Sequence, residues 1–186
     1  MQPTTQLHTP AVTRYSTAMV ALHWLMLVLM VAVFASINLR ELYPKGTDMR
    51  NLMKTIHFML GLLVLVMVAL RVAAKWSSPQ PAAASDVAWA QWAAKAGHLT
   101  LYGFMVVMPL LGWATLSAAG KPIPFFGLEL PALLAANKEL AHNLEEIHET
   151  IGELGYWLIG LHAAAALVHH FVFKDGLLNR MSLRNA

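Results

Sequence analysis

Four long apolar runs decide what this chain can fold into. They cover about residues 17–39, 55–74, 97–119 and 150–173, and each is near the ~20 residues that cross a bilayer as a helix. The hydrocarbon core offers no partner to exposed backbone, so an open strand cannot cross it. Joined by short connections, the runs predict an all-α membrane protein, a four-transmembrane-helix up-down bundle made by a single domain, residues 1–186.

Composition narrows the chemistry available to such a bundle. The chain is 58% hydrophobic and 12% charged, whereas soluble domains carry about 25% charged residues. It has no cysteine, which excludes disulfides, thiolate-bound iron–sulfur clusters and haem attached through C-x-x-C-H. The nine histidines are therefore the main chemical resource. No cleaved signal is expected, because the first apolar run is too long for one.

Three histidines share one face of the last run. His148 and His162 are fourteen residues apart and His169 follows seven later, so at about 100° per residue they fall within roughly 60° of one another. Fourteen helical residues rise roughly 21 Å. This face therefore presents imidazoles at two levels of the membrane.

The up-down topology supplies partners at both levels. His57 begins the second run at the level of His148, whereas His23 and His98 lie early in the first and third runs, near the level of His162. The expected pairs are His57 with His148, and His162 with either His23 or His98. Neutral imidazoles facing each other across a gap are axial ligands for haem iron.

Two other interpretations of these histidines stand beside haem binding. Each histidine could simply hydrogen-bond a neighbouring helix, as polar residues in membrane helices do, although intramembrane ionisable residues are costly and usually functional. A metal-ion carrier would need carboxylates at the same depth, and the apolar midsections contain none. Small residues near the histidines would leave room for a porphyrin. They are Gly61, Gly152, Gly155 and Gly160.

A basic connection leads into His57. It contains Arg40, Lys45, Arg50 and Lys54. Basic residues flank membrane helices routinely, but a cationic loop also raises the encounter rate of a small anion. Lysines and arginines divide almost evenly between the two sides, so the positive-inside rule does not orient the bundle.

Several motifs resemble the bacterial cytochrome b561 family over about residues 14–183. They are RYS…LHW (Arg14–Trp24), the single His57, His98 with the following LTLY, and HE…LGYWLIGLHAAAALVHHFVFKD…LxRM (His148–Met181). The resemblance implies two haem b groups in a bacterial inner membrane, with both termini cytoplasmic. It makes His23 and His162 the ligands of the inner haem iron, and His57 and His148 those of the outer one.

The likeness is strongest to the superoxide-oxidising members of the family. It implies a superoxide:ubiquinone oxidoreductase that oxidises periplasmic superoxide to dioxygen. For such an enzyme, the placement of Arg40, Lys45, Arg50 and Lys54 before His57 predicts that they steer the anion toward the outer haem. It also implies that His169 contacts ubiquinone. His98, at the inner level, is expected to bond a haem propionate or to line the quinone pocket. The alternative is an electron-transfer subunit that anchors a periplasmic dehydrogenase or hydrogenase to the quinone pool. The expected partners are superoxide, ubiquinone and the lipid bilayer, with no nucleic acid and no obligate protein partner.

Residues around the histidine-rich end have less definite roles. His170 is rotated about 100° from His169 and is expected at the interface. Lys174 and Asp175 either relay protons or cap the helix end and remain solvated. His8 and His142 lie outside the core and are expected to be solvated.

Overall fold

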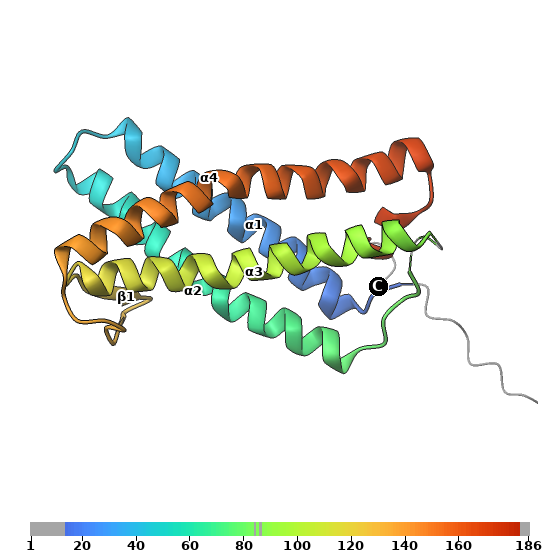
Figure 1. Cartoon of the computed structure of the whole chain (residues 1–186), viewed down its shortest axis with the longest axis horizontal. Coiled ribbons are helices and arrows are strands. Elements are labelled where there is room, and N and C mark those ends of the chain that lie inside the picture. Colours follow the sequence, from blue (N-terminus) through green and yellow to red (C-terminus); the bar gives the residue numbers. More distant parts are fainter. Residues whose placement is uncertain (1–13, 84, 86, 183–186) are drawn as a thin grey trace, which may run out of the picture.

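Four long helices make up the molecule in the computed structural model, which describes residues 14–83, 85 and 87–182 (Figure 1). The helices are α1 (Thr17–Leu39), α2 (Asp48–Ser77), α3 (Ala88–Ala118) and α4 (Lys138–Val168). All four are long and apolar enough to cross a membrane. The predicted all-α, four-helix membrane architecture is therefore confirmed. His8 lies outside the described residues.

The helices extend beyond the apolar runs that predict them. Only α1 has the predicted bounds, because hydropathy marks the part of a helix that lies in hydrocarbon and not its polar end turns. Side chains cap three of the N-termini. Ser16 accepts a hydrogen bond from the Met19 amide, Thr47 from the Arg50 amide and Asn137 from the Leu140 amide. Such caps satisfy amides that have no partner within the helix.

A small β-hairpin interrupts the connection between α3 and α4. Strands β1 (Ile123–Phe125) and β2 (Leu128–Leu130) pair antiparallel. The two turn residues, Phe126 and Gly127, have positive φ values of 48° and 87°, as a tight hairpin turn requires. Sequence analysis missed this element because phenylalanine rarely adopts that conformation. The hairpin packs through buried Ile123 against Leu62 of α2 and Leu116 of α3.

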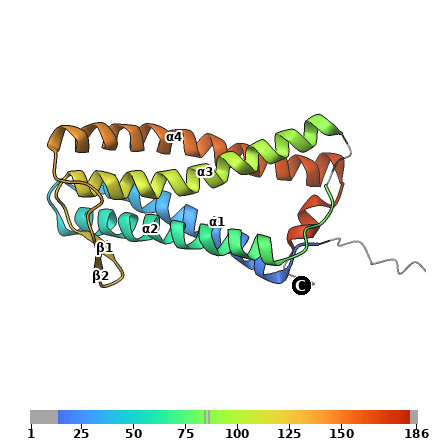
Figure 2. The same cartoon turned by 60° about the horizontal axis from the view of Figure 1, so that its bottom comes forward.

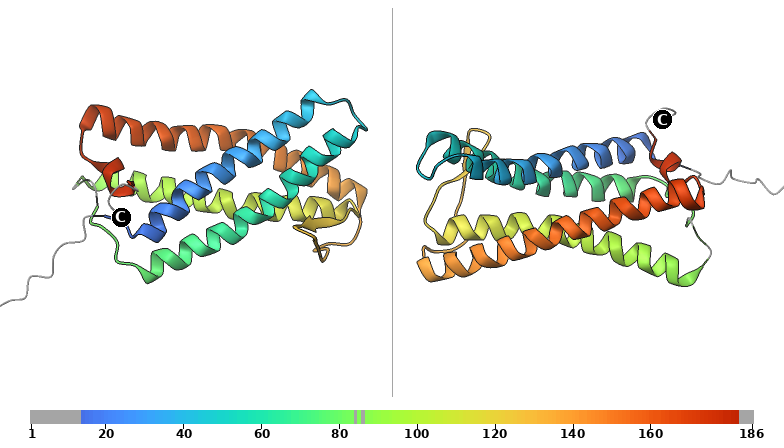
Figure 3. Two further views of the ribbon diagram at one scale, coloured as in Figure 1. Left: turned by 180° about the vertical axis from the view of Figure 1, so that it is seen from behind. Right: turned by 90° about the horizontal axis from the view of Figure 1, so that it is seen from above.

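The helices lie in two layers, α1 with α2 and α3 with α4 (Figure 3). The layers are joined where α2 packs on α3. The buried core is shared by α1, α2 and α3. Its members are Met26, Leu29, Val64, Met67, Val68 and Met105. Among the described residues, the α4 backbone lies close to α3 and farther from α1 and α2, which α4 reaches through side chains such as Tyr156, the acceptor of a hydrogen bond from Asn38.

Glycines set the close approach of α3 and α4. A Cβ placed on Gly155 would run into the Phe104 ring, and one on Gly152 would lie 3.5 Å from Met108 Cε. These two glycines therefore face α3, and the expectation that they make room beside His148 is wrong. Gly61 and Gly160 differ, because a Cβ at either would meet no atom within 4 Å.

The two ends of the bundle are built differently (Figure 2). One end, which we call the hairpin end, carries the α1–α2 turn, with the 3₁₀ turn η1 (Arg40–Leu42), and the β-hairpin. At the other, the terminal end, α4 continues as a π-helical turn, η2 (His169–Phe173), followed by the 3₁₀ turn η3 (Leu177–Met181). Trp24 Nε1 donates to the Met181 carbonyl at 2.9 Å, and Arg180 donates to the Ala82 carbonyl at 2.7 Å.

Replacing Gly155 by alanine should destabilise the protein by about 1–3 kcal/mol, because the new methyl group overpacks against Phe104. Gly160→Ala is the matched control, since both changes gain the same helix propensity of about 1 kcal/mol but only one meets a neighbour. Thermal unfolding followed by circular dichroism in one detergent compares them. Equal melting temperatures for the two variants would contradict the packing role of Gly155.

Candidate functional site

His57 and His148 face each other near the hairpin end. Their ring centroids are 6.2 Å apart and the ring planes make an angle of 89°. His57 Nδ1 lies 3.1 Å from the Val33 carbonyl oxygen of α1. A carbonyl can only accept, so Nδ1 carries the hydrogen and Nε2 keeps its lone pair. This is the arrangement in which an outer partner orients a metal-binding imidazole.

The ring of His148, on α4, packs against Gly112 of α3. A Cβ on Gly112 would lie 3.3 Å from His148 Cε1, so only glycine leaves the ring its full space. The Nδ1 atom of His148 is buried and makes no hydrogen bond of ordinary geometry, although the Met108 carbonyl of α3 faces the ring. A buried nitrogen without such a bond is costly, and a site of this kind calls for a functional explanation.

A second histidine group lies toward the terminal end. The ring centroid of His162 is 6.3 Å from that of His23 on α1 and 5.7 Å from that of His98 on α3. The structure thus brings both of the predicted partners to His162. His23 and His162 meet across α1 and α4, which do not pack closely on each other in the described part of the chain.

The donor sets fit haem with two axial histidines. Two metal–imidazole bonds of about 2 Å, plus about 1.2 Å from each ring centroid to its nitrogen, add up to roughly 6.4 Å. The 6.2 Å and 6.3 Å pairs match this spacing more closely than the 5.7 Å pair. Gly61, one turn after His57, has open space where a Cβ would stand. Within the described residues, no group of three or more His, Asp or Glu side chains is arranged to hold a metal ion.

Arg71 of α2 joins the second histidine group, a placement that sequence analysis did not foresee. Its Nη1 lies 3.0 Å from His23 Nδ1, and its guanidinium carbon lies 5.9 Å from the Tyr102 ring centroid. The available signal was a lone arginine within an apolar run. Such a charge must face the bundle interior or an aqueous surface.

His169 begins the π-helical turn η2 and hydrogen-bonds the carboxylate of Asp175. Its Nδ1 lies 2.5 Å from Asp175 Oδ2, and Asp175 Oδ1 accepts from the Leu177 amide at 3.0 Å. The hydrogen bond from His169, followed by that from Leu177, holds the pKa of Asp175 below its usual range. Lys174 adopts the left-handed conformation, with φ 51°, and this reverses the chain. Asp175 therefore both orients His169 and begins the η3 turn.

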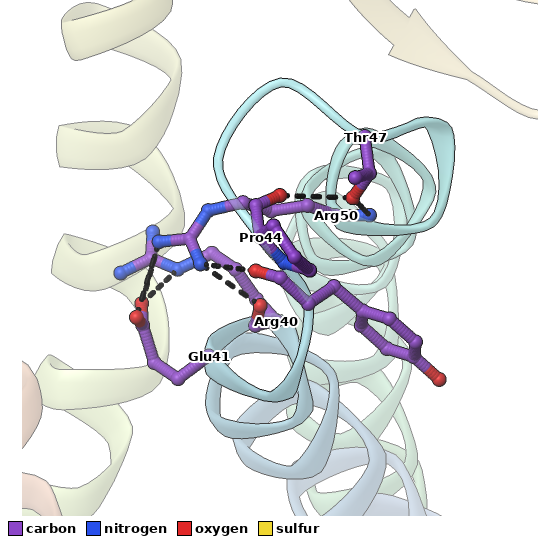
Figure 4. Close-up of polar contacts among 6 residues, drawn as sticks. Arg40, Glu41, Pro44, Thr47 and Arg50 are labelled. Atoms are coloured by element: carbon purple, nitrogen blue, oxygen red, sulfur yellow. Dashed lines mark hydrogen bonds and ion pairs between the residues drawn. The ribbon is translucent and has the colours of Figure 1, made fainter.

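The two arginines of the basic loop at the hairpin end share one carboxylate, so part of the charge of the loop is neutralised within it (Figure 4). Arg50 is only 8% exposed and donates to the carbonyl oxygens of Arg40 and Tyr43 at 3.1 and 2.9 Å. It also pairs with Glu41 at 3.1 Å, and Arg40 Nε pairs with the same carboxylate at 2.8 Å. Sequence analysis did not foresee Glu41 as their common partner.

The two lysines of the loop are arranged differently. Lys45 is exposed. Lys54 is half-buried one turn before His57 and interacts electrostatically with Arg40, Arg50, Lys121 and Glu145. Positive charge therefore surrounds the approach to His57, with Lys121 of the β-hairpin connection contributing and Glu145 opposing it. The side chain of His142 is 71% exposed and lies beside Glu146, as expected of a solvated residue. His170 is half-buried in η2.

Membrane-crossing helices that face one another through paired imidazoles are typical of b-type membrane cytochromes. This chain has that arrangement. Residues 14–182 match the model of the family described as prokaryotic cytochrome b561. The protein named cytochrome b561 homolog 1 of Escherichia coli (strain K12) is 35% identical over 172 residues, 92% of this chain and 98% of that protein.

Two further relatives agree with this match. The protein named probable superoxide oxidase CybB of Yersinia pestis is 35% identical over 169 residues, 90% of this chain and 95% of that protein. Cytochrome b561 homolog 2 of Escherichia coli is 29% identical over 170 residues, 90% of each chain. The chain belongs to the prokaryotic cytochrome b561 family. It is accordingly a bacterial inner-membrane protein of an oxidoreductase-type family that binds b-type haem.

Arg50→Gln should destabilise the protein by about 1–3 kcal/mol, because two carbonyls and the Glu41 carboxylate lose their donor. Lys45→Gln removes the same charge from an exposed position and should stay within about 0.5 kcal/mol of wild type. Thermal unfolding in detergent measures both. If the two variants lose equal stability, the Arg50 contacts do not hold the α1–α2 loop.

Proposed function

We propose that this protein binds two haem b groups and carries electrons across the membrane from superoxide to ubiquinone. The observation that supports it most is the repeated spacing of 6.2 and 6.3 Å in two interhelical histidine pairs. The two α4 members of these pairs, His148 and His162, are separated by roughly 21 Å along the helix. Two redox groups in line would span most of a bilayer core of about 30 Å.

The proposed ligands are His57 with His148 for one haem and His23 with His162 for the other. When bound, each haem accepts and releases one electron at a time. Val33 holds the His57 ring so that Nε2 points away from α1's carbonyl. We assign His98 to the side of the second haem and not to its iron, because the 5.7 Å separation of His98 from His162 fits two iron–imidazole bonds less well than the 6.3 Å separation of His23 from His162. The resemblance in LHW around His23 supports the same choice.

The hairpin end is the proposed entry for superoxide and therefore faces the periplasm. The terminal end, with both termini, then faces the cytoplasm. Arg40 and Arg50 share Glu41, so these three side chains together contribute one net positive charge. Lys45 and Lys54 add unshared charge near His57. A cationic approach raises the local concentration of an anion and its association rate. Superoxide gives up one electron there and leaves as dioxygen.

His169 and Asp175 at the terminal end support quinone reduction. Two electrons from two superoxide ions, together with two protons, convert ubiquinone to ubiquinol. A quinone oxygen needs a hydrogen-bond donor and then a proton, and histidine is the commonest side chain for such transfer. With Asp175 bound to Nδ1, the His169 Nε2 side is left to face the quinone. The carboxylate fixes the ring as it does in other His–Asp pairs.

Haem stoichiometry tests the ligand assignment. Purified wild type should carry two haems per chain, whereas His57→Ala and His23→Ala should each retain one, because a six-coordinate site loses an axial ligand. His98→Ala should retain two, and His142→Ala serves as the control for an exposed histidine. Haem is measured against protein by its alkaline pyridine spectrum. Loss of a haem in His98→Ala with none lost in His23→Ala would reverse the second assignment.

Stopped-flow mixing tests the donor and the acceptor separately. Superoxide should reduce the haems rapidly and more slowly as salt rises, because screening weakens attraction to the basic approach. In His169→Ala, reduction by superoxide should be unchanged and reoxidation by ubiquinone should slow at least tenfold, a typical contribution of general acid–base catalysis being 10²–10⁴-fold. Haem absorbance is the readout for both steps.

The donor and the acceptor can be refuted independently by these two measurements. Haems that superoxide does not reduce would point to another donor, such as the periplasmic dehydrogenase or hydrogenase of the alternative function. A His169→Ala variant that reoxidises at the wild-type rate would exclude His169 from the quinone site. If the rate at which superoxide reduces the haems does not change with salt, steering by Lys45 and Lys54 is excluded.

A further inference from the structure

Arg71 places a permanent cation within the apolar run of α2. The residue is half-buried, and its Nε is buried without a hydrogen bond. One turn later, the Lys75 ammonium lies 5.9 Å from the centroid of the same Tyr102 ring that Arg71 approaches at 5.9 Å. Tyr102 therefore holds the side chains of Arg71 and Lys75 on the α3 side of α2, beside His23 and His98.

This cationic group has no counter-ion in the described part of the chain. Arg71 interacts electrostatically with His23 and His162, and Lys75 with His98. No acidic side chain among the described residues forms an ion pair with either of them. Charged residues at membrane depth are costly and pair with an opposite charge. The geometry thus calls for an anion next to His23.

The bond between Arg71 and His23 points to where that anion lies. A guanidinium only donates, so its 3.0 Å contact makes His23 Nδ1 the acceptor. A neutral imidazole that binds iron through Nε2 must carry its hydrogen on Nδ1. The two arrangements exclude each other, so a haem ligated by Nε2 of His23 releases Arg71 from this contact. Nη1 then joins Nε as a donor that needs an acceptor.

We propose that Arg71, assisted by Lys75, binds a propionate carboxylate of the haem held between His23 and His162. This inference rests on the haem site proposed above. The propionates are the only anionic groups on the edge of haem, and the planar guanidinium fork suits bidentate binding of a carboxylate. Arg71 is thereby a positioning residue that sets the orientation of the porphyrin and its reduction potential.

The test combines a substitution in the protein with a change of cofactor from haem to haem dimethyl ester. Wild type, Arg71→Gln and Arg71→Lys are prepared in detergent under haem limitation and loaded with haem or with haem dimethyl ester, whose propionates carry no charge. The midpoint potentials are then measured by redox titration of the α-bands. Lys95→Gln is the matched control, because Lys95 loses the same charge from α3 while stacking on Trp92 at 5.3 Å and away from His23.

With haem, Arg71→Gln should disfavour reduction of one haem about tenfold, equivalent to 59 mV for a one-electron couple, because the propionate charge that Arg71 neutralises would then oppose the added electron. Arg71→Lys should retain most of the wild-type potential, and Lys95→Gln all of it. With the dimethyl ester, wild type and Arg71→Gln should have the same potential. Such non-additivity is the signature of direct coupling between two groups.

Two results would overturn the proposal. One is an unchanged potential in Arg71→Gln with haem, and the other is a shift of the same size with the ester, which would mean that Arg71 acts through His23. If Arg71→Gln does not accumulate, Arg71→Lys is compared with wild type, each loaded with haem and with the ester. The smaller shift in potential of Arg71→Lys must then also vanish with the ester. Wild type that binds no haem would instead refute the proposed function.

Discussion

The hydrocarbon core of a bilayer supplies no hydrogen bonds, and this constraint governs every polar side chain between the two ends of the bundle. Backbone groups are satisfied within helices, but imidazoles and guanidinium groups need partners from other helices or from a ligand. Val33 supplies one for His57. His148 Nδ1 and Arg71 Nε remain without one. In the proposed function, both of these atoms belong to side chains that contact a haem, which connects the polar interior to electron transfer.

The packing of α4 follows from the same requirement. Helices α1, α2 and α3 share a buried core of methionine, leucine and valine, whereas α4 is anchored on α3 through Gly112 and Gly155. It meets α2 through His148, and α1 through His162 and through Tyr156, which packs on Phe34 and accepts a hydrogen bond from Asn38. In the proposed function, a helix placed in this way presents its histidine face to the haems, and its opposite face is left to lipid. The apolar groove along Tyr156, Gly160 and Leu161 lies on α4 as well.

Charge at the two ends is organised for different purposes. At the hairpin end, Glu41 and Arg50 tie the α1–α2 turn together, so only part of the formal positive charge of the loop is available to an approaching anion. At the terminal end, Asp175 pairs with His169 and the η3 turn is fastened to α1 by Trp24. The redox path in the proposed function runs between a cationic approach and a His–Asp pair.

Much of this could be predicted from the sequence, because hydropathy and helical rise act locally. The four apolar runs give the bundle, and residue spacing alone puts His57 level with His148. The choice between His23 and His98 could not be made from rise, since both lie at the level of His162. The hairpin was missed because its turn depends on Phe126 in an unusual conformation. The glycines near His148 were misjudged because helix rotation depends on contacts with α3.

The sequence by itself determined the class of the protein, the number of spans, the absence of thiol chemistry and the membrane level of each histidine. These follow from composition and from the fixed geometry of a helix. Only the tertiary structure decided which cations are free and which are neutralised, because that depends on contacts such as Arg50 with Glu41. It also placed Arg71 against His23 and Asp175 against His169. Side-chain direction, unlike depth, is fixed only when helices pack and chain segments turn back on themselves.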